Sequence, residues 1–160
     1  MNYLIATPIK ETWPKKVNEK LFFLSESALL NYRYASIYKK IEINRFRWDN
    51  KKVFGEDFKY LLKIYEKLLT LISCKLNEIH DQNYSIKFWR ILIGPWLSTF
   101  IHIYFERWNN VKASLKKNTI NKCIFLNLDK DYFIPYDNKN FINFSQNDLW
   151  NQFLYQSIIS

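Results

Sequence analysis

The chain has 160 residues, of which 48% are hydrophobic and 24% charged, and its formal net charge is +9. This composition is typical of a globular protein and excludes a disordered chain. The two glycines, Gly55 and Gly94, lie too far apart to build a Walker A loop or a GxGxxG motif. The two cysteines are too few for a disulfide scaffold or a Cys-rich zinc site, so we expect no metal and a cytoplasmic setting.

Short apolar runs predict the strands of a sheet. The first two are Asn2–Thr7 and Leu21–Leu24. Alternating residues in Lys40–Arg47 indicate a third strand or an extended connector, and Lys122–Leu128 predicts the last strand. Between them, Ser25 and Glu26 favour a helix of about ten residues, because serine is a good N-cap and an acidic residue suits the first turn.

Two long helices are predicted in the middle of the chain. Apolar residues repeat at three and four positions from Glu56 to His80, which indicates an amphipathic helix. A second helix is expected over residues 85–117, with a kink or break near Pro95 because proline cannot donate its backbone hydrogen bond. Its first half is apolar almost all round, so we expect a central buried helix. A membrane span is disfavoured because the uncharged stretch, Ile91–Phe105, is shorter than the ~20 residues required.

The order of these elements predicts the fold class. A terminal helix is expected from about Ser145, after an aromatic loop rich in Asp and Asn. The elements together predict an α/β fold, a small Rossmann-like layer of about three to four strands with a dominant helical insertion. The length corresponds to a single domain over 1–160 or to the N-terminal part of a larger protein, with no internal boundary.

Polar and aromatic residues follow the first two predicted strands, where an open α/β sheet places ligand contacts. Thr7, Glu11 and Trp13 follow the first strand and could orient a sugar or nucleotide ring; the alternative is a surface loop with a packed tryptophan. Ser25 and Glu26 follow the second strand, and their alternative role is helix capping. Glu11 and Glu26 are a hypothetical acid/base pair, which would require surroundings that separate their pKa values.

Three further candidates lie on the predicted helices. Arg90 lies in an apolar stretch and must find an anion, either a ligand phosphate or carboxylate or a structural partner such as Glu66 or Glu78. Trp96 belongs to the same unusual segment, and His80 is either a ligand contact or a cation favoured by the helix dipole. The lysines are scattered and match no nucleic-acid-binding motif, so no specific nucleic acid is expected.

Several motifs occur together in an order that resembles a known family. They are TPIKETW at Thr7–Trp13, LFFLSESALL, RWDN at Arg47–Asn50, LNEIH, YSIKFWRILIGPWL at Tyr84–Leu97 and FERW at Phe105–Trp108. The chain, from Met1 to about Lys130, resembles the N-terminal part of a family of transferases encoded in bacterial O-antigen and other surface-polysaccharide loci. The resemblance implies a role in assembling a cell-surface glycan and a two-domain, glycosyltransferase-like architecture.

The resemblance also implies site residues and partners. Independently of the resemblance, we expect Glu11 or Glu26 to act as general base on a saccharide or lipid-linked glycan acceptor. Substrate contacts would come from Thr7, Trp13, Ser25, His80, Arg90 and Trp96. Family members are considerably longer, so this chain is expected to be a truncated, acceptor-side portion whose nucleotide-sugar donor is bound by a C-terminal transferase chain. The alternatives are a non-catalytic remnant or binding domain that needs a partner chain, and a peripheral protein at the inner membrane face.

Overall fold

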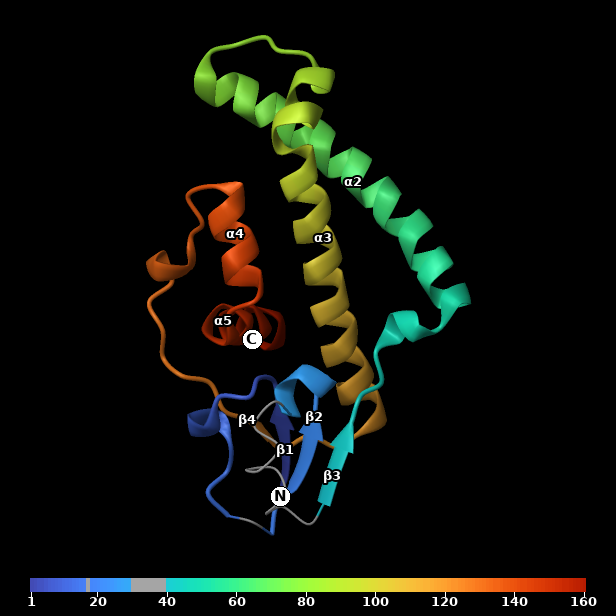
Figure 1. The fold of residues 1–160 in the computed structure, drawn as a ribbon, viewed down its shortest axis with the longest axis vertical. Coiled ribbons are helices and arrows are strands. Elements are labelled where there is room, and N and C mark those ends of the chain that lie inside the picture. Colours follow the sequence, from blue (N-terminus) through green and yellow to red (C-terminus); the bar gives the residue numbers. More distant parts are fainter. Residues whose placement is uncertain (17, 30–39) are drawn as a thin grey trace. The chain divides into compact units, whose positions relative to one another are not determined.

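The chain folds into two compact units. A computed structural model describes residues 1–16, 18–29 and 40–160 (Figure 1). The sheet unit comprises Met1–Phe46 and Glu106–Ser160, and the helical unit comprises Arg47–Phe105. The helical unit corresponds to the insertion predicted from the sequence.

A four-stranded parallel sheet forms the sheet unit. Its strands are β1 (Asn2–Ile5), β2 (Lys20–Phe23), β3 (Lys40–Ile43) and β4 (Lys122–Cys123). Their order is β3-β2-β1-β4, and every pairing is parallel. The predicted α/β class is therefore confirmed, and Lys40–Ile43 is a strand rather than a connector. β1, β3 and β4 are shorter than the predicted runs, whereas β2 has the predicted length and begins one residue earlier.

Both faces of the sheet are covered, as parallel sheets require. Side chains alternate along each strand, so Ile5, Leu21 and Phe23 pack on one face with Trp13 and Ala28. Leu4, Phe22 and Leu24 pack on the opposite face with Val111 and Tyr155. The inner strands β1 and β2 are mostly apolar because both of their faces are buried, whereas the edge strand β3 carries Lys40 and Glu42 and is only partly buried.

The second face is covered by helices. The C-terminal part of α3 (Ile86–Lys117) supplies Val111, and α5 (Asp148–Ile159) supplies Tyr155. α4 (Asn138–Ser145) precedes α5 and was predicted as loop; the Asp137 side chain accepts from the Asn140 amide and so caps a helix in this polar stretch. The C-terminal part of α3 buries one side against the sheet.

Short 3-10 helices connect these elements. They are η1 (Lys10–Thr12), η2 (Glu26–Leu29), η3 (Arg47–Asp49) and η4 (Asp131–Phe133). The helix predicted after Ser25 begins as η2, and most of its remaining length lies outside the described residues.

α2 (Lys51–His80) begins the hairpin of the helical unit. It starts five residues before the predicted Glu56 because the Asn50 side chain caps it, accepting from Lys52 and Val53 amides. It ends where predicted, since Asp81 adopts a left-handed conformation with φ of 50°.

α3 continues through Pro95, so of the predicted kink or break, the break does not occur. Leu97 and Ile101 pack against Leu61 and Leu69 of α2. The stretch is not buried all round, however, because Ile91 is 73% and Leu92 62% exposed. This part of α3 belongs to a two-helix hairpin, in which a helix buries only the side that faces its partner.

Gly94 permits a close approach within that hairpin. A Cβ at this position would lie 2.6 Å from Oη of Tyr65.

Within the described part of the chain, none of the helices combines the length and apolarity needed to cross a membrane.

Candidate functional site

The candidate site lies at the carboxyl edge of the sheet. Residues after β1, β2 and β3 meet there because the strands are parallel. β1 lies between β2 and β4, so the strand order reverses direction at β1. Open α/β sheets bind ligands outside the carboxyl ends of strands at such a switch point.

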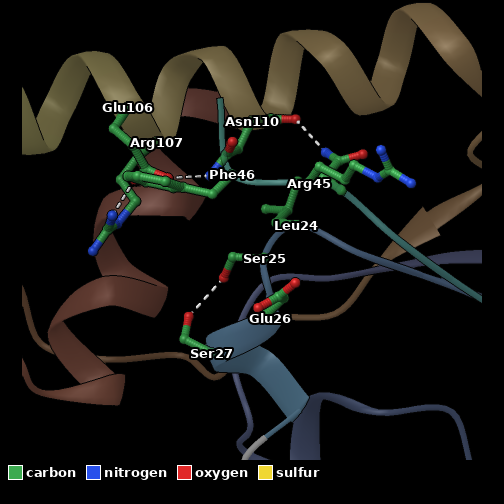
Figure 2. Close-up of a pocket in the computed structure, with 10 residues that line it drawn as sticks. Leu24, Ser25, Glu26, Ser27, Arg45, Phe46, Glu106, Arg107 and Asn110 are labelled. Carbon is green, nitrogen blue, oxygen red and sulfur yellow. Dashed lines mark hydrogen bonds and ion pairs between the residues drawn. The ribbon is translucent and has the colours of Figure 1, made fainter. Parts of the chain in front are cut away.

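The first pocket has a volume of about 280 Å³. It contains the Glu26 carboxylate, and the Ser25 and Ser27 hydroxyls lie 2.6 Å apart at its edge (Figure 2). Phe46 adds an aromatic ring that is 46% exposed. The complete lining is Leu24, Ser25, Glu26, Ser27, Asn44, Arg45, Phe46, Glu106, Arg107 and Asn110.

The second pocket, of about 200 Å³, adjoins the first. The two pockets share Ser27 and Arg107 in their linings. The second lies at the end of β1, where Thr7 follows the strand. Its lining is Ala6, Thr7, Pro8, Ser27, Arg107, Ser145, Gln146, Asp148, Asn151 and Tyr155.

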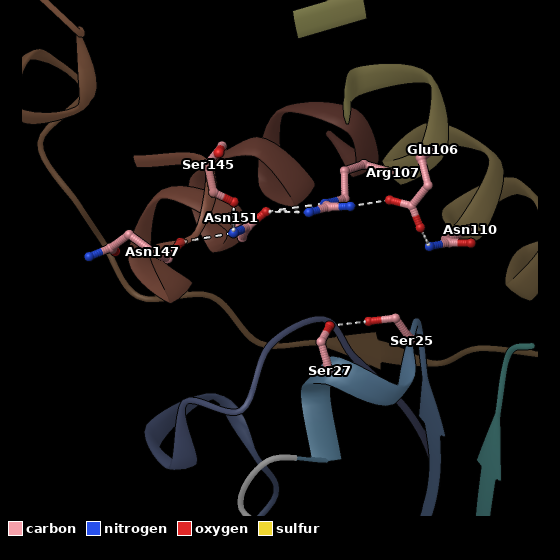
Figure 3. Close-up of polar contacts among 8 residues, drawn as sticks. All are labelled: Ser25, Ser27, Glu106, Arg107, Asn110, Ser145, Asn147 and Asn151. Carbon is pink, nitrogen blue, oxygen red and sulfur yellow. Dashed lines mark hydrogen bonds and ion pairs between the residues drawn. The ribbon is translucent and has the colours of Figure 1, made fainter. Parts of the chain in front are cut away.

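Arg107 is held between two helices by a polar network (Figure 3). Its Nε and Nη2 each donate to Oδ1 of Asn151 at 3.1 Å. Its Nη1 donates to the Glu106 carboxylate, which also accepts from the amide of Asn110. The Asn151 amide donates to the carbonyl oxygen of Ser145 at 3.0 Å. The guanidinium is thus oriented and charge-balanced before any ligand binds.

The network continues to the end of β3. The Asn44 amide donates to the Asn110 carbonyl oxygen at 3.1 Å and to Oγ of Ser114 at 2.7 Å. Glu106, Asn110 and Ser114 are all buried. Buried polar groups are stable only when hydrogen-bonded, so this network fixes the loop after β3 against α3.

Burial changes the acidity of two groups in the second pocket. It raises the pKa of the Tyr155 hydroxyl to about 12, against an opposing effect from the Arg107 cation. It also raises the pKa of the Asp148 carboxyl above its ordinary value. Tyr155 is therefore a neutral hydroxyl at physiological pH.

Thr7 and Trp13, both predicted as ligand contacts, lie together. The Trp13 indole donates to the Thr7 carbonyl oxygen at 3.0 Å and packs edge-on to Phe23 at 5.3 Å. Trp13 is only 3% exposed, so its ring belongs to the core beneath the site. Thr7 is 2% exposed, and its Oγ1 has no hydrogen-bond partner in the part of the chain that the structure describes.

Glu26 and Ser25 line the first pocket, whereas Glu11 is exposed on η1 and lines neither pocket. The other candidates belong to the helical unit. Arg90 donates two hydrogen bonds to Glu66, at 2.6 and 2.8 Å, which is one of the structural ion pairs considered from the sequence. This pair raises the pKa of Arg90 and lowers that of Glu66, chiefly through these hydrogen bonds.

His80 and Trp96 make aromatic contacts in the helical unit. The His80 ring stacks with Trp89 at 6.2 Å, and Trp96 stacks with Phe100 at 5.7 Å. Over residues 1–16, 18–29 and 40–160, no group of three or more His, Cys, Asp or Glu is placed to hold a metal ion. What the sheet edge offers is a carboxylate, hydroxyls, amides and an oriented guanidinium.

Sequence reasoning missed several lining residues. The rule that selected Thr7 and Ser25, position after a strand, would also have selected Asn44 and Phe46 had the third strand been assigned firmly. Glu106 and Arg107 lie in the FERW motif, but a charged pair on an amphipathic helix is usually solvated. Asp148 and Asn151 carried no signal, because the helix break before Asp148 was not predicted.

Comparison with known proteins adds a family to this geometry. No curated protein and no solved structure matches the chain. A family model described as LIC12162 family transferase matches residues 2–160, almost the whole chain. With its α/β sheet and pockets at the carboxyl edge, the chain belongs to the LIC12162 family of transferases.

Proposed function

We propose that the chain is a glycosyltransferase-like transferase that binds a saccharide acceptor at the first pocket, in the assembly of a cell-surface polysaccharide. The observation that carries the proposal is the composition of this pocket. It combines the Glu26 carboxylate, a hydroxyl pair and the exposed Phe46 ring. Sugars present hydroxyls and apolar ring faces, and a pocket with few placed polar groups beside an aromatic surface suits them.

The charge of the pocket supports the same ligand class. Arg107 is paired with Glu106, and the other two charged residues of the lining, Arg45 and Glu26, carry opposite charges. The lining therefore has no excess of positive charge, despite the +9 of the chain. A neutral, hydroxyl-bearing acceptor fits such a lining better than a phosphate.

Glu26 is the proposed general base. The acceptor hydroxyl oxygen forms a bond to the anomeric carbon of a nucleotide-sugar donor, while the bond from that carbon to the phosphate oxygen breaks. The nucleotide leaves with the electron pair, and the hydroxyl proton passes to Glu26. The proposed setting is the cytoplasm, at the inner membrane face where the acceptor is lipid-linked.

Glu26→Gln tests this assignment because it keeps the shape and removes the base. UDP-glucose, UDP-galactose, UDP-N-acetylglucosamine and GDP-mannose are each incubated with methyl glycosides, and disaccharide products are measured by mass spectrometry. We expect Glu26→Gln to slow the reaction roughly 10²- to 10⁴-fold. Glu56→Gln, an exposed position on α2, is the matched control and should transfer at the wild-type rate.

Equal rates for wild type and Glu26→Gln would contradict the role of Glu26. The second candidate function is a saccharide-binding chain that needs a partner. The large exposed apolar residues on α3, Ile91 and Leu92, favour it as a surface another chain could cover. Binding of methyl glycosides without transfer from any of the four donors would select this function.

A further inference from the structure

The second pocket is lined by a threonine whose buried hydroxyl has no hydrogen-bond partner among residues 1–16, 18–29 and 40–160. This residue is Thr7, which is 2% exposed, and the unpaired atom is its Oγ1, as far as the described residues show. An unsatisfied buried polar group costs about 1–3 kcal/mol. Such a group in a native structure indicates a missing partner, either water or a ligand.

The two pockets are continuous subsites. Ser27 and Arg107 line both. Each pocket alone is smaller than the ~300 Å³ at the lower end of ligand sites, whereas the two together exceed it. A ligand longer than one ring would therefore occupy both.

The second pocket repeats the chemistry of the first. Asp148 provides a carboxylate as Glu26 does, Gln146 and Asn151 contribute amides, and Thr7 and Tyr155 contribute hydroxyls. Arg107 is already paired with Glu106, so Asp148 leaves this lining without free positive charge. An anion would be repelled by Asp148, whereas ring hydroxyls could donate to its carboxylate.

We propose that the second pocket is a subsite for a second hydroxyl-bearing ring, adjoining the acceptor ring and hydrogen-bonded by Thr7 and Asp148. This inference rests on the proposed function, because it extends the same saccharide site. The second ring is either the next residue of the acceptor or the sugar of the donor. In both cases Thr7 Oγ1 gains a hydrogen-bond partner, which none of the described residues provides.

Thr7→Val tests the subsite, since valine keeps the shape and removes the hydroxyl. Thr12→Val is the matched control. Thr12 is also buried, at 4% exposure, but its hydroxyl donates to the Ile9 carbonyl oxygen at 2.7 Å and it lines neither pocket. Thr7→Val should keep or raise the melting temperature, whereas Thr12→Val should lower it.

Binding is measured by calorimetry with methyl glycosides, with the disaccharides lactose, maltose, cellobiose and diacetylchitobiose, and with UDP-glucose. We expect the best disaccharide, or UDP-glucose in the presence of a saturating methyl glycoside, to bind Thr7→Val about 3- to 10-fold more weakly than wild type. Methyl glycosides alone should bind both equally. Asp148→Asn should weaken the same ligand, and Thr12→Val should not.

The outcomes separate the two proposals. If Thr7→Val binds the disaccharide more weakly than wild type, the second ring belongs to the acceptor. If it binds UDP-glucose more weakly, the second ring is the sugar of the donor. If methyl glycosides bind but Thr7→Val and Asp148→Asn change no affinity, the subsite is overturned and the acceptor pocket stands. If inorganic pyrophosphate binds and Thr7→Val weakens it, the second pocket is an anion site instead. If no saccharide binds, the proposed function itself fails.

Discussion

The two units differ in how they bury charge. In the sheet unit, the Glu106 side chain is 6% exposed and bonds Arg107 and Asn110. In the helical unit, Arg90 and Glu66 form a two-bond ion pair with side chains 41% and 54% exposed. Similar ion pairs therefore have different consequences. The buried pair orients Arg107, which lines both pockets. The exposed pair lies on the surface of a hairpin that is held together by apolar contacts between its two helices.

Removing the carboxylate of each ion pair tests whether the two pairs differ in their contribution to stability. Glu106→Gln leaves Arg107 without its counter-charge in a mostly buried network, so we expect a loss of about 3 kcal/mol of unfolding free energy. Glu66→Gln should cause no measurable loss, because exposed pairs are screened by solvent. Urea unfolding of both variants measures this, and equal losses would refute the distinction.

The buried Tyr155 hydroxyl predicts that the folded chain becomes less stable in alkaline solution. Its pKa is about 12 in the folded chain and about 10 when unfolded. The folded state thus binds the proton more tightly, so stability is complete below pH 10 and falls as the pH rises toward 12. Over this pH range, the unfolding free energy of Tyr155→Phe should decrease by roughly 2 kcal/mol less than that of the wild type.

The measurement is urea unfolding of wild type and Tyr155→Phe across that pH range. Cys123, whose pKa burial also raises to about 12, contributes in the same direction but is present in both proteins. Parallel pH profiles for the two proteins would show that the Tyr155 hydroxyl is not buried as described.

The two helical glycines give the smallest effect and probe the packing of the hairpin. Gly55 has open space where a Cβ would lie, so Gly55→Ala should stabilise α2 by about 1 kcal/mol. Gly94→Ala should lose that gain, because its Cβ would meet Oη of Tyr65. Thermal unfolding should show the gain restored in Gly94→Ala combined with Tyr65→Phe. Equal stabilisation by both single substitutions would contradict the close approach.

Sequence patterns predicted the sheet and the hairpin well for a physical reason. Apolar runs such as Leu21–Leu24 and the repeat in α2 report burial directly, and Asp81 ends α2 as expected. The prediction that the first half of α3 is fully buried was wrong. It was based on apolar residues all round the helix, but Ile91 and Leu92 are exposed.

The candidate site was harder to predict because its polar groups are buried. Glu106 and Asn110 look like residues of a solvated face, and only the packing of α3 on the sheet shows otherwise. Trp13 shows the converse, since an aromatic residue after a strand proved to be core. A sequence pattern indicates which apolar residues are buried, but it does not indicate which polar residues form hydrogen bonds with one another.

Mapping saccharide binding by NMR tests the central claim most directly. The ¹⁵N-labelled chain is titrated with methyl glycosides, and the amide shifts of every residue are followed. We predict shifts at Ser25, Glu26, Ser27 and Phe46, with those around His80, Arg90 and Trp96 unchanged. Shifts confined to the helical unit would contradict the account and would show that the saccharide binds to the hairpin instead.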